Sequence, residues 1–142
     1  MDKIIINSLQ DMRMFAKDLV SELSAGSVVA LSGNLGAGKT TLVQMASKLL
    51  GVRRGVLSPS FSILKIYPAR AGKIKKVCHI DFYRLAKKEA LLGAKECFDD
   101  NEAVCFVEWA ERAKEIIPKC ALWLEIKIKK GNIRVITKTS AN

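Results

Sequence analysis

Apolar and polar residues recur along the chain with a helical period in four segments. Apolar side chains spaced three and four residues apart predict an amphipathic helix over 8–23, with Ser8 as its N-cap. The same spacing predicts helices over 40–50, 86–98 and 109–117. These segments are separated by short apolar runs, so the pattern favours alternating helices and strands.

Strands are predicted where apolar runs are short or alternate with polar residues. Two uninterrupted runs, 27–32 and 103–107, are typical of buried parallel strands. The other strands form two antiparallel pairs. These pairs are 56–67 with 74–81 around a turn at 68–73, and 122–129 with 133–137 around Gly131 and Asn132. The elements predict one α/β domain over residues 1–142, a three-layer α/β/α fold with a mixed central sheet and a C-terminal antiparallel hairpin.

The composition is that of a globular domain. The 142 residues are 49% hydrophobic and 27% charged, which excludes disorder and leaves room for one core.

No apolar run reaches the 18 or so residues of a membrane helix. Asp2 and Asp11 near the start are unlike a secretory signal, so a cytoplasmic protein is expected. The four cysteines form no C-x-x-C pair and accompany one histidine, which argues against a zinc site and predicts reduced core thiols.

Charge changes the picture of possible partners. Lys and Arg outnumber Asp and Glu by 24 to 14, which gives a net charge of +10. Such an excess favours contact with nucleic acid, nucleotide phosphates or an acidic protein. A solvated basic face explains the same excess equally well.

A glycine-rich loop carries the most specific chemical signal. The string GNLGAGKT at 33–40 fits G-x-x-x-x-G-K-[ST] and lies between a predicted strand and a predicted helix. Glycines let backbone N–H groups surround a phosphate, the lysine supplies charge to the β- and γ-oxygens, and the threonine hydroxyl can ligate Mg²⁺. The residues expected to cradle nucleotide are Gly33, Asn34, Leu35, Gly36, Ala37, Gly38, Lys39, Thr40 and Thr41. The loop predicts a nucleotide triphosphatase or kinase.

Further residues refine this prediction. Neither D-x-x-G nor N-K-x-D occurs in the sequence, so ATP is favoured over GTP. Asp81 and Glu108 each end an apolar run, and both are candidates to hold Mg²⁺ or to orient the attacking water. The segment 58–61 has the placement of a switch loop that senses the γ-phosphate, although a plain Ser-Pro turn fits it as well.

Four strings together resemble one family, that of TsaE, also called YjeE. They are GNLGAGKTT at 33–41, SPSFS at 58–62, HIDFYRL at 79–85 and VEWAER at 107–112. The family consists of small bacterial P-loop ATPases of tRNA threonylcarbamoyladenosine synthesis, and the resemblance covers essentially the whole chain. It implies a single P-loop NTPase domain.

The resemblance also implies roles for individual residues. Lys39 would bind phosphate, Thr40 and Glu108 would ligate Mg²⁺, and Asp81 would be a second essential carboxylate near the γ-phosphate. The remaining implied residues are Ser58, Ser60 and Phe61 in the switch loop, Trp109 at the partner surface, Ser8 and Leu9 near the base, and Arg134 at the nucleotide. The chain departs from the family pattern at Asn34, where aspartate is common, and at Ser60 and Ser62, where threonines are usual.

The function implied by the resemblance is that of an accessory ATPase, weak alone, which acts with TsaD and TsaB. ATP or ADP and Mg²⁺ are the expected ligands, and tRNA is an expected partner, directly or through the complex. Two alternatives remain open. A small-molecule kinase would transfer the γ-phosphate to an acceptor, and a basic RNA-binding module would use the nucleotide for regulation.

Overall fold

In the part of the chain that the structure describes, seven strands form one mixed sheet in the order β1-β7-β6-β2-β5-β4-β3. The computed structural model describes residues 2–56, 64–84 and 88–140. The strands are β1 (Asp2–Ile6), β2 (Val28–Ser32), β3 (Leu64–Ala71), β4 (Ile74–Asp81), β5 (Ala103–Glu108), β6 (Leu122–Ile128) and β7 (Arg134–Ser140). The four central strands, β6, β2, β5 and β4, are parallel, and antiparallel strands flank them at both edges.

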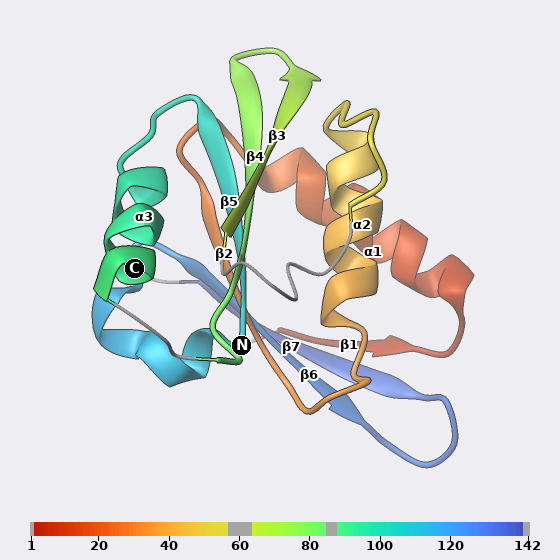
Figure 1. Ribbon diagram of the computed structural model, residues 1–142. Helices are drawn as coiled ribbons and strands as arrows, with labels where there is room; N and C mark the ends of the chain where they lie inside the picture. The colour runs from red at the N-terminus through yellow and green to blue at the C-terminus, as the bar shows by residue number, and fades with distance from the viewer. Residues whose placement is uncertain (1, 57–63, 85–87, 141–142) are drawn as a thin grey trace.

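Helices cover both faces of this sheet (Figure 1). On one face lie α1 (Leu9–Glu22) and α2 (Lys39–Leu49), and on the other lie α3 (Lys88–Phe98) and the 3-10 helix η1 (Ala110–Ile116). One apolar core lies under α1 and α2, and a second lies under α3 and η1. The predicted α/β/α layers, mixed sheet and C-terminal hairpin are therefore confirmed. Among the helices that the structure describes, none has the length and apolar character needed to cross a bilayer.

The parallel strands bring the candidate chemistry to one edge of the sheet. Every residue of β5 is buried, and β2 is buried up to its last residue, as their uninterrupted apolar runs predict. In the register of β4 with β5, Asp81 lies beside Glu108, and Leu31 of β2 lies on the other side of Glu108. Since the carboxyl ends of parallel strands meet at the same edge, both carboxylates lie next to the loop that follows β2.

The structure differs from the sequence-based expectations at several elements. The strand β1, which was not predicted, pairs antiparallel with β7, and only Ile6 in it is buried. The predicted turn at 68–73 is shorter, because β3 continues to Ala71. Pro68 is accommodated there because β3 is an edge strand, where a missing N–H is tolerated.

Two further expectations also need correction. The helix predicted over 109–117 is a 3-10 helix broken at Ala113, whose φ of −143° is not helical. Cys120 is exposed, whereas the other three cysteines are buried as expected. Residues 57–63, 86 and 87 were predicted in strand, loop or helix and lie outside the described residues.

Gly51 allows the turn after α2 to pack against β3. Its φ is +84°, and a Cβ there would lie 2.7 Å from the Arg70 carbonyl oxygen. Gly26 has a similar φ of +98°, but a Cβ at that position would meet no atom of the described part of the chain within 4 Å. A left-handed alanine costs about 1–2 kcal/mol at either site, and the clash adds about 1–3 kcal/mol at Gly51.

We therefore expect Gly51→Ala to lower the free energy of unfolding clearly more than Gly26→Ala does. Urea denaturation of the two variants measures the difference. Equal destabilisation would show that the backbone at Gly51 and Arg70 relaxes enough to admit a Cβ.

Candidate functional site

The loop between β2 and α2 has a backbone that only glycine adopts readily. Gly33, Gly36 and Gly38 have φ values of 148°, 81° and 111°. At Gly33 a Cβ would lie 2.5 Å from the Ile126 carbonyl oxygen, so no side chain fits there. Gly38 is the N-cap of α2, and no side chain of the described residues caps this helix. The N-terminus of α2 is therefore open to an anion, which its N–H groups and dipole favour.

Lys39 lies at the centre of the site and is only 5% exposed. Its Nζ donates to the carbonyl oxygen of Gly33 and, at 3.3 Å, to that of Asn34. The same ammonium lies 4.0 Å from the centroid of the Trp109 ring. Burial lowers the pKa of Lys39, and nearby carboxylates, Glu108 first among them, oppose this shift. The cation is held inside the loop by carbonyl oxygens that a phosphate can replace.

Glu108 connects the loop to the sheet. The Thr40 hydroxyl donates to both carboxylate oxygens, at 2.8 Å to Oε1 and 2.9 Å to Oε2. His79 Nε2 is 2.5 Å from Oε2, and because an ionised carboxylate only accepts, this nitrogen is the donor. His79 is completely buried, and its Nδ1 has no hydrogen-bond partner among the described residues. The histidine thus fixes the rotamer of the carboxylate that faces Thr40.

The oxygen atoms of Thr40 and Glu108 suit a magnesium ion that arrives with a nucleotide. Hydroxyl and carboxylate oxygens are the hard ligands that Mg²⁺ prefers. The described residues contain no cluster of three or more His, Cys, Asp or Glu side chains that could hold a metal. Since Mg²⁺ is commonly bound by one or two carboxylates together with substrate phosphates, Thr40 and Glu108 suit it as a partial site.

Asp81 ends β4 beside Glu108 and is partly buried. Its Oδ1 accepts the backbone N–H of Tyr83 at 2.8 Å. Burial raises the pKa of Asp81, and the Glu108 carboxylate raises it further. The hydrogen bond from Tyr83 lowers this pKa and offsets part of the rise. The structure therefore brings both predicted carboxylates to the loop, and it is Glu108 that contacts Thr40.

Two aromatic rings and an arginine cover this end of the site. Trp109 has a φ of 55°, the one positive φ among the described non-glycine residues, and its ring centroid is 4.9 Å from that of Tyr83. The Arg112 guanidinium lies 4.8 Å from the Tyr83 ring centroid and 5.0 Å from that of Trp109, and it donates to the Tyr83 carbonyl oxygen. We call Tyr83, Trp109 and Arg112 the aromatic cover.

A pocket of 290 Å³ lies on the other side of the loop, against the start of α1. It brings Ser8, Leu9 and Arg134 together with Gly36, Gly38 and Thr41 of the loop and of α2. Arg134 donates from its Nε to the Ala37 carbonyl oxygen and from a terminal nitrogen to that of Gly36, each at 3.1 Å. The three residues that the sequence placed near a nucleotide therefore do adjoin the loop, although they come from distant parts of the chain.

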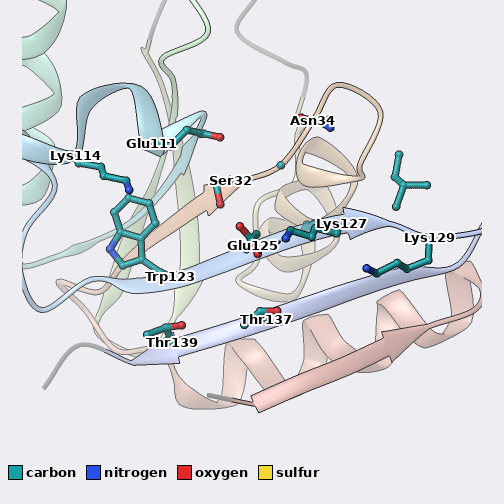
Figure 2. Close-up of a pocket in the computed structure, with 13 residues that line it drawn as sticks. Ser32, Asn34, Glu111, Lys114, Trp123, Glu125, Lys127, Lys129, Thr137 and Thr139 are labelled. Atoms are coloured by element: carbon teal, nitrogen blue, oxygen red, sulfur yellow. Dashed lines mark ion pairs between the residues drawn. The ribbon is translucent and has the colours of Figure 1, made fainter.

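A larger groove of 830 Å³ begins at Ser32 and Asn34 and follows the face of β6 and β7 (Figure 2). Trp123, Glu125 and Lys127 line the groove along β6. The Lys127 Nζ lies 3.7 Å from the Glu125 Oε1. The groove mixes both signs of charge with threonines and an indole. Its lining includes Gly33 and Asn34, so the groove adjoins the start of the glycine loop.

Sequence reasoning assigned no role to His79 or to Tyr83. Both belong to the string HIDFYRL, on either side of Asp81, and that position was the available signal. Arg112 lies in the string VEWAER, and its contact with the two rings depends on the tertiary fold. Ser58, Ser60 and Phe61, expected in a switch loop, lie outside the described residues.

Comparisons with known proteins agree over nearly the whole chain. The model of the family "Threonylcarbamoyl adenosine biosynthesis protein TsaE" matches residues 6–136. The TsaE protein of Treponema pallidum is 33% identical over 137 residues, which make up 95% of this chain and 98% of that protein. The TsaE protein of Bacillus subtilis is 35% identical over 131 residues, 92% of this chain and 80% of that one. The crystal structure of Bacillus subtilis YdiB has a TM-score of 0.79 and 30% identity and covers 99% of this chain and 86% of its own.

Proposed function

The chain belongs to the TsaE family of tRNA threonylcarbamoyladenosine biosynthesis, and we propose that it is the ATP-hydrolysing accessory subunit that works with TsaD and TsaB. The observation that carries the proposal is the contact of Thr40 with Glu108 at the mouth of the glycine loop. It joins a phosphate cradle to a carboxylate on the neighbouring strand, which is the arrangement that phosphoryl transfer from a nucleotide requires. A cytoplasmic location accords with a tRNA pathway.

The residues of the loop bind the phosphates in this proposal. N–H groups of the loop and of the first turn of α2 donate to the β-phosphate. Lys39 Nζ exchanges the carbonyl oxygens of Gly33 and Asn34 for phosphate oxygens. Thr40 and Glu108 would hold Mg²⁺, which would supply positive charge against the phosphate oxygens. The pocket formed with Ser8, Leu9 and Arg134 takes the base.

Asp81 orients the attacking water and accepts its proton as the water oxygen bonds to the γ-phosphorus. The bond from that phosphorus to the β,γ-bridging oxygen breaks at the same time, and ADP leaves with the electron pair. Its raised pKa makes it a stronger base than an exposed aspartate would be. His79 does not touch the reacting atoms, and it acts by holding Glu108 toward Thr40. Hydrolysis therefore depends on two carboxylates that neighbouring parallel strands hold side by side.

Partner proteins are needed because the site is incompletely covered. Tyr83 is 43% exposed, so the aromatic cover has one face open to solvent. Trp109 lies against Lys39, so the ring is beside the ammonium that would contact the phosphate. TsaD and TsaB would dock on the aromatic cover, exclude water and fix the catalytic side chains, which supplies the preorganisation that the free chain lacks.

We expect slow ATP turnover by the chain alone and a rise of at least about tenfold when TsaD and TsaB are added. Steady-state phosphate release, measured without partners, with them and finally with tRNA, tests this. Lys39→Ala in the presence of both partners is the control for contaminating activity. Fast turnover by the chain alone, unchanged by TsaD and TsaB, would instead favour a self-sufficient ATPase or a kinase.

A further inference from the structure

A second concave surface lies at the opposite end of α2 from the glycine loop. It is a pocket of 790 Å³ bordered by Lys48, Arg53, Arg54 and Arg70, and a smaller pocket of 270 Å³ continues it along β3. We call these four residues the basic pocket. The 11 residues of α2 place it about 16 Å from the loop, at 1.5 Å per residue.

The backbone around the basic pocket is fixed by specific contacts. The Arg70 N–H donates to the Leu50 carbonyl oxygen at 2.9 Å, which joins β3 to the end of α2. Gly51 packs so closely on Arg70 that it has no room for a Cβ. On the other side, the Gln44 side-chain amide donates to the Val56 carbonyl oxygen at 2.6 Å. The segment that carries Arg53 and Arg54 is therefore held at both ends.

The described residues leave the charge of the basic pocket uncompensated. Among them, no carboxylate lines either of its two cavities. In the ranges 2–56, 64–84 and 88–140, the lysines that form ion pairs are Lys76, Lys127 and Lys138, and none belongs to the basic pocket. All four cations of the pocket are exposed. A hollow bordered by four such cations attracts a polyanion strongly, because its walls focus the positive potential.

The chemistry of the pocket favours phosphodiesters over carboxylates of a protein surface. Three of its four cations are arginines, whose planar guanidinium groups bind phosphate or carboxylate oxygens in pairs, so the choice between the two rests on the rest of the lining. Its lining, as far as the structure describes it, contains no aromatic side chain, whereas protein interfaces are enriched in aromatic anchors and base recognition uses stacking. The pocket therefore suits the backbone of a folded nucleic acid, contacted without regard to sequence.

We propose that the basic pocket binds the phosphate backbone of tRNA. The choice of tRNA rests on the proposed function, since the family acts in tRNA modification, whereas the phosphodiester chemistry rests on the pocket. Because the pocket and the glycine loop lie at opposite ends of α2, a nucleotide in the loop does not occupy the RNA site. This chain thus contributes directly to holding the RNA.

The test compares two double variants that lose the same charge. Arg53→Ala with Arg70→Ala removes two cations of the basic pocket, and Arg13→Ala with Lys17→Ala removes two exposed cations of α1. Fluorescence anisotropy with labelled tRNA is measured at several salt concentrations. We expect the pocket variant to bind tRNA about tenfold more weakly than wild type. The slope of the logarithm of the binding constant against the logarithm of the salt concentration should be smaller in magnitude by about 1.5, since each phosphate contact contributes roughly 0.7–0.9. The affinity of the α1 variant for tRNA should stay within about twofold of the wild-type affinity.

Other results would overturn the proposal. Equal weakening in both double variants would mean diffuse attraction by the net charge, and unchanged binding by the pocket variant would remove the pocket from RNA contact. Loss of binding to polyglutamate, with tRNA binding intact, would assign the pocket to an acidic protein. The thermal shift produced by Mg²⁺ and ATP without RNA should be the same in all three proteins, so failure of the nucleotide assignment is recognised separately.

Discussion

Replacing Glu108 with glutamine should lower ATP hydrolysis by at least about a hundredfold, which corresponds to about 2.7 kcal/mol in activation free energy. Glutamine keeps the shape of the side chain and can still accept from Thr40 and His79. It loses the negative charge that would hold Mg²⁺ beside the phosphate oxygens. The affinity for ADP should remain within a few-fold of the wild-type affinity, because the loop and Lys39 make the ground-state contacts to the phosphates.

Asp81→Asn should reduce hydrolysis to a similar degree, since the amide cannot accept a proton from water. Asp100→Asn is the matched control, because Asp100 pairs with Lys76 away from the loop. Phosphate release in the presence of TsaD and TsaB, with ADP affinity measured alongside, separates catalysis from binding. A Glu108 or Asp81 variant that turned over ATP at the wild-type rate would leave that carboxylate with a purely structural role.

Lys39→Ala should abolish most of the stabilisation that nucleotide gives to the fold. A ligand that binds only the native state adds about 2.7 kcal/mol at a hundredfold excess over its Kd. For a domain of this size that free energy raises the Tm by roughly 10 °C. The alanine variant lacks the ammonium that lies inside the loop and should show little of this shift.

Thermal denaturation with and without Mg²⁺ and ATP checks this expectation. Lys127→Ala is the control, because Lys127 lines the groove on β6 and does not enter the loop. It should keep the full shift. If Lys39→Ala were stabilised as much as wild type, the nucleotide would bind somewhere other than the glycine loop.

The parts of the site that the sequence predicted are those encoded locally. Gly33, Gly38 and Lys39 lie within seven consecutive residues, so the shape of the loop follows from a short string. The cap of α1 is local as well, since the Ser8 hydroxyl accepts the N–H of Asp11 three residues on. Such features depend on backbone preferences that neighbouring residues determine.

The parts that were missed depend on register between distant strands. The family resemblance implied that Glu108 shares a site with Thr40, but the residues alone left Asp81 and Glu108 open, because the choice depends on how β4, β5 and β2 align. The contact between His79 and Glu108, which joins residues 29 positions apart, was not predicted. β1 forms by pairing with the open edge of β7, and the residues of β1 are mostly exposed, so they carry little strand pattern of their own. The basic pocket likewise joins Arg53 to Arg70 through the packing of Gly51.

A crystal structure of the chain with Mg²⁺ and ADP tests the proposed site most directly. The expected result has the β-phosphate inside the loop with Lys39 Nζ turned toward it, the metal at Thr40 and Glu108, and the base beside Ser8, Leu9 and Arg134. A nucleotide bound instead in the groove beside Trp123, with Lys39 still donating to Gly33 and Asn34, would contradict the assignment.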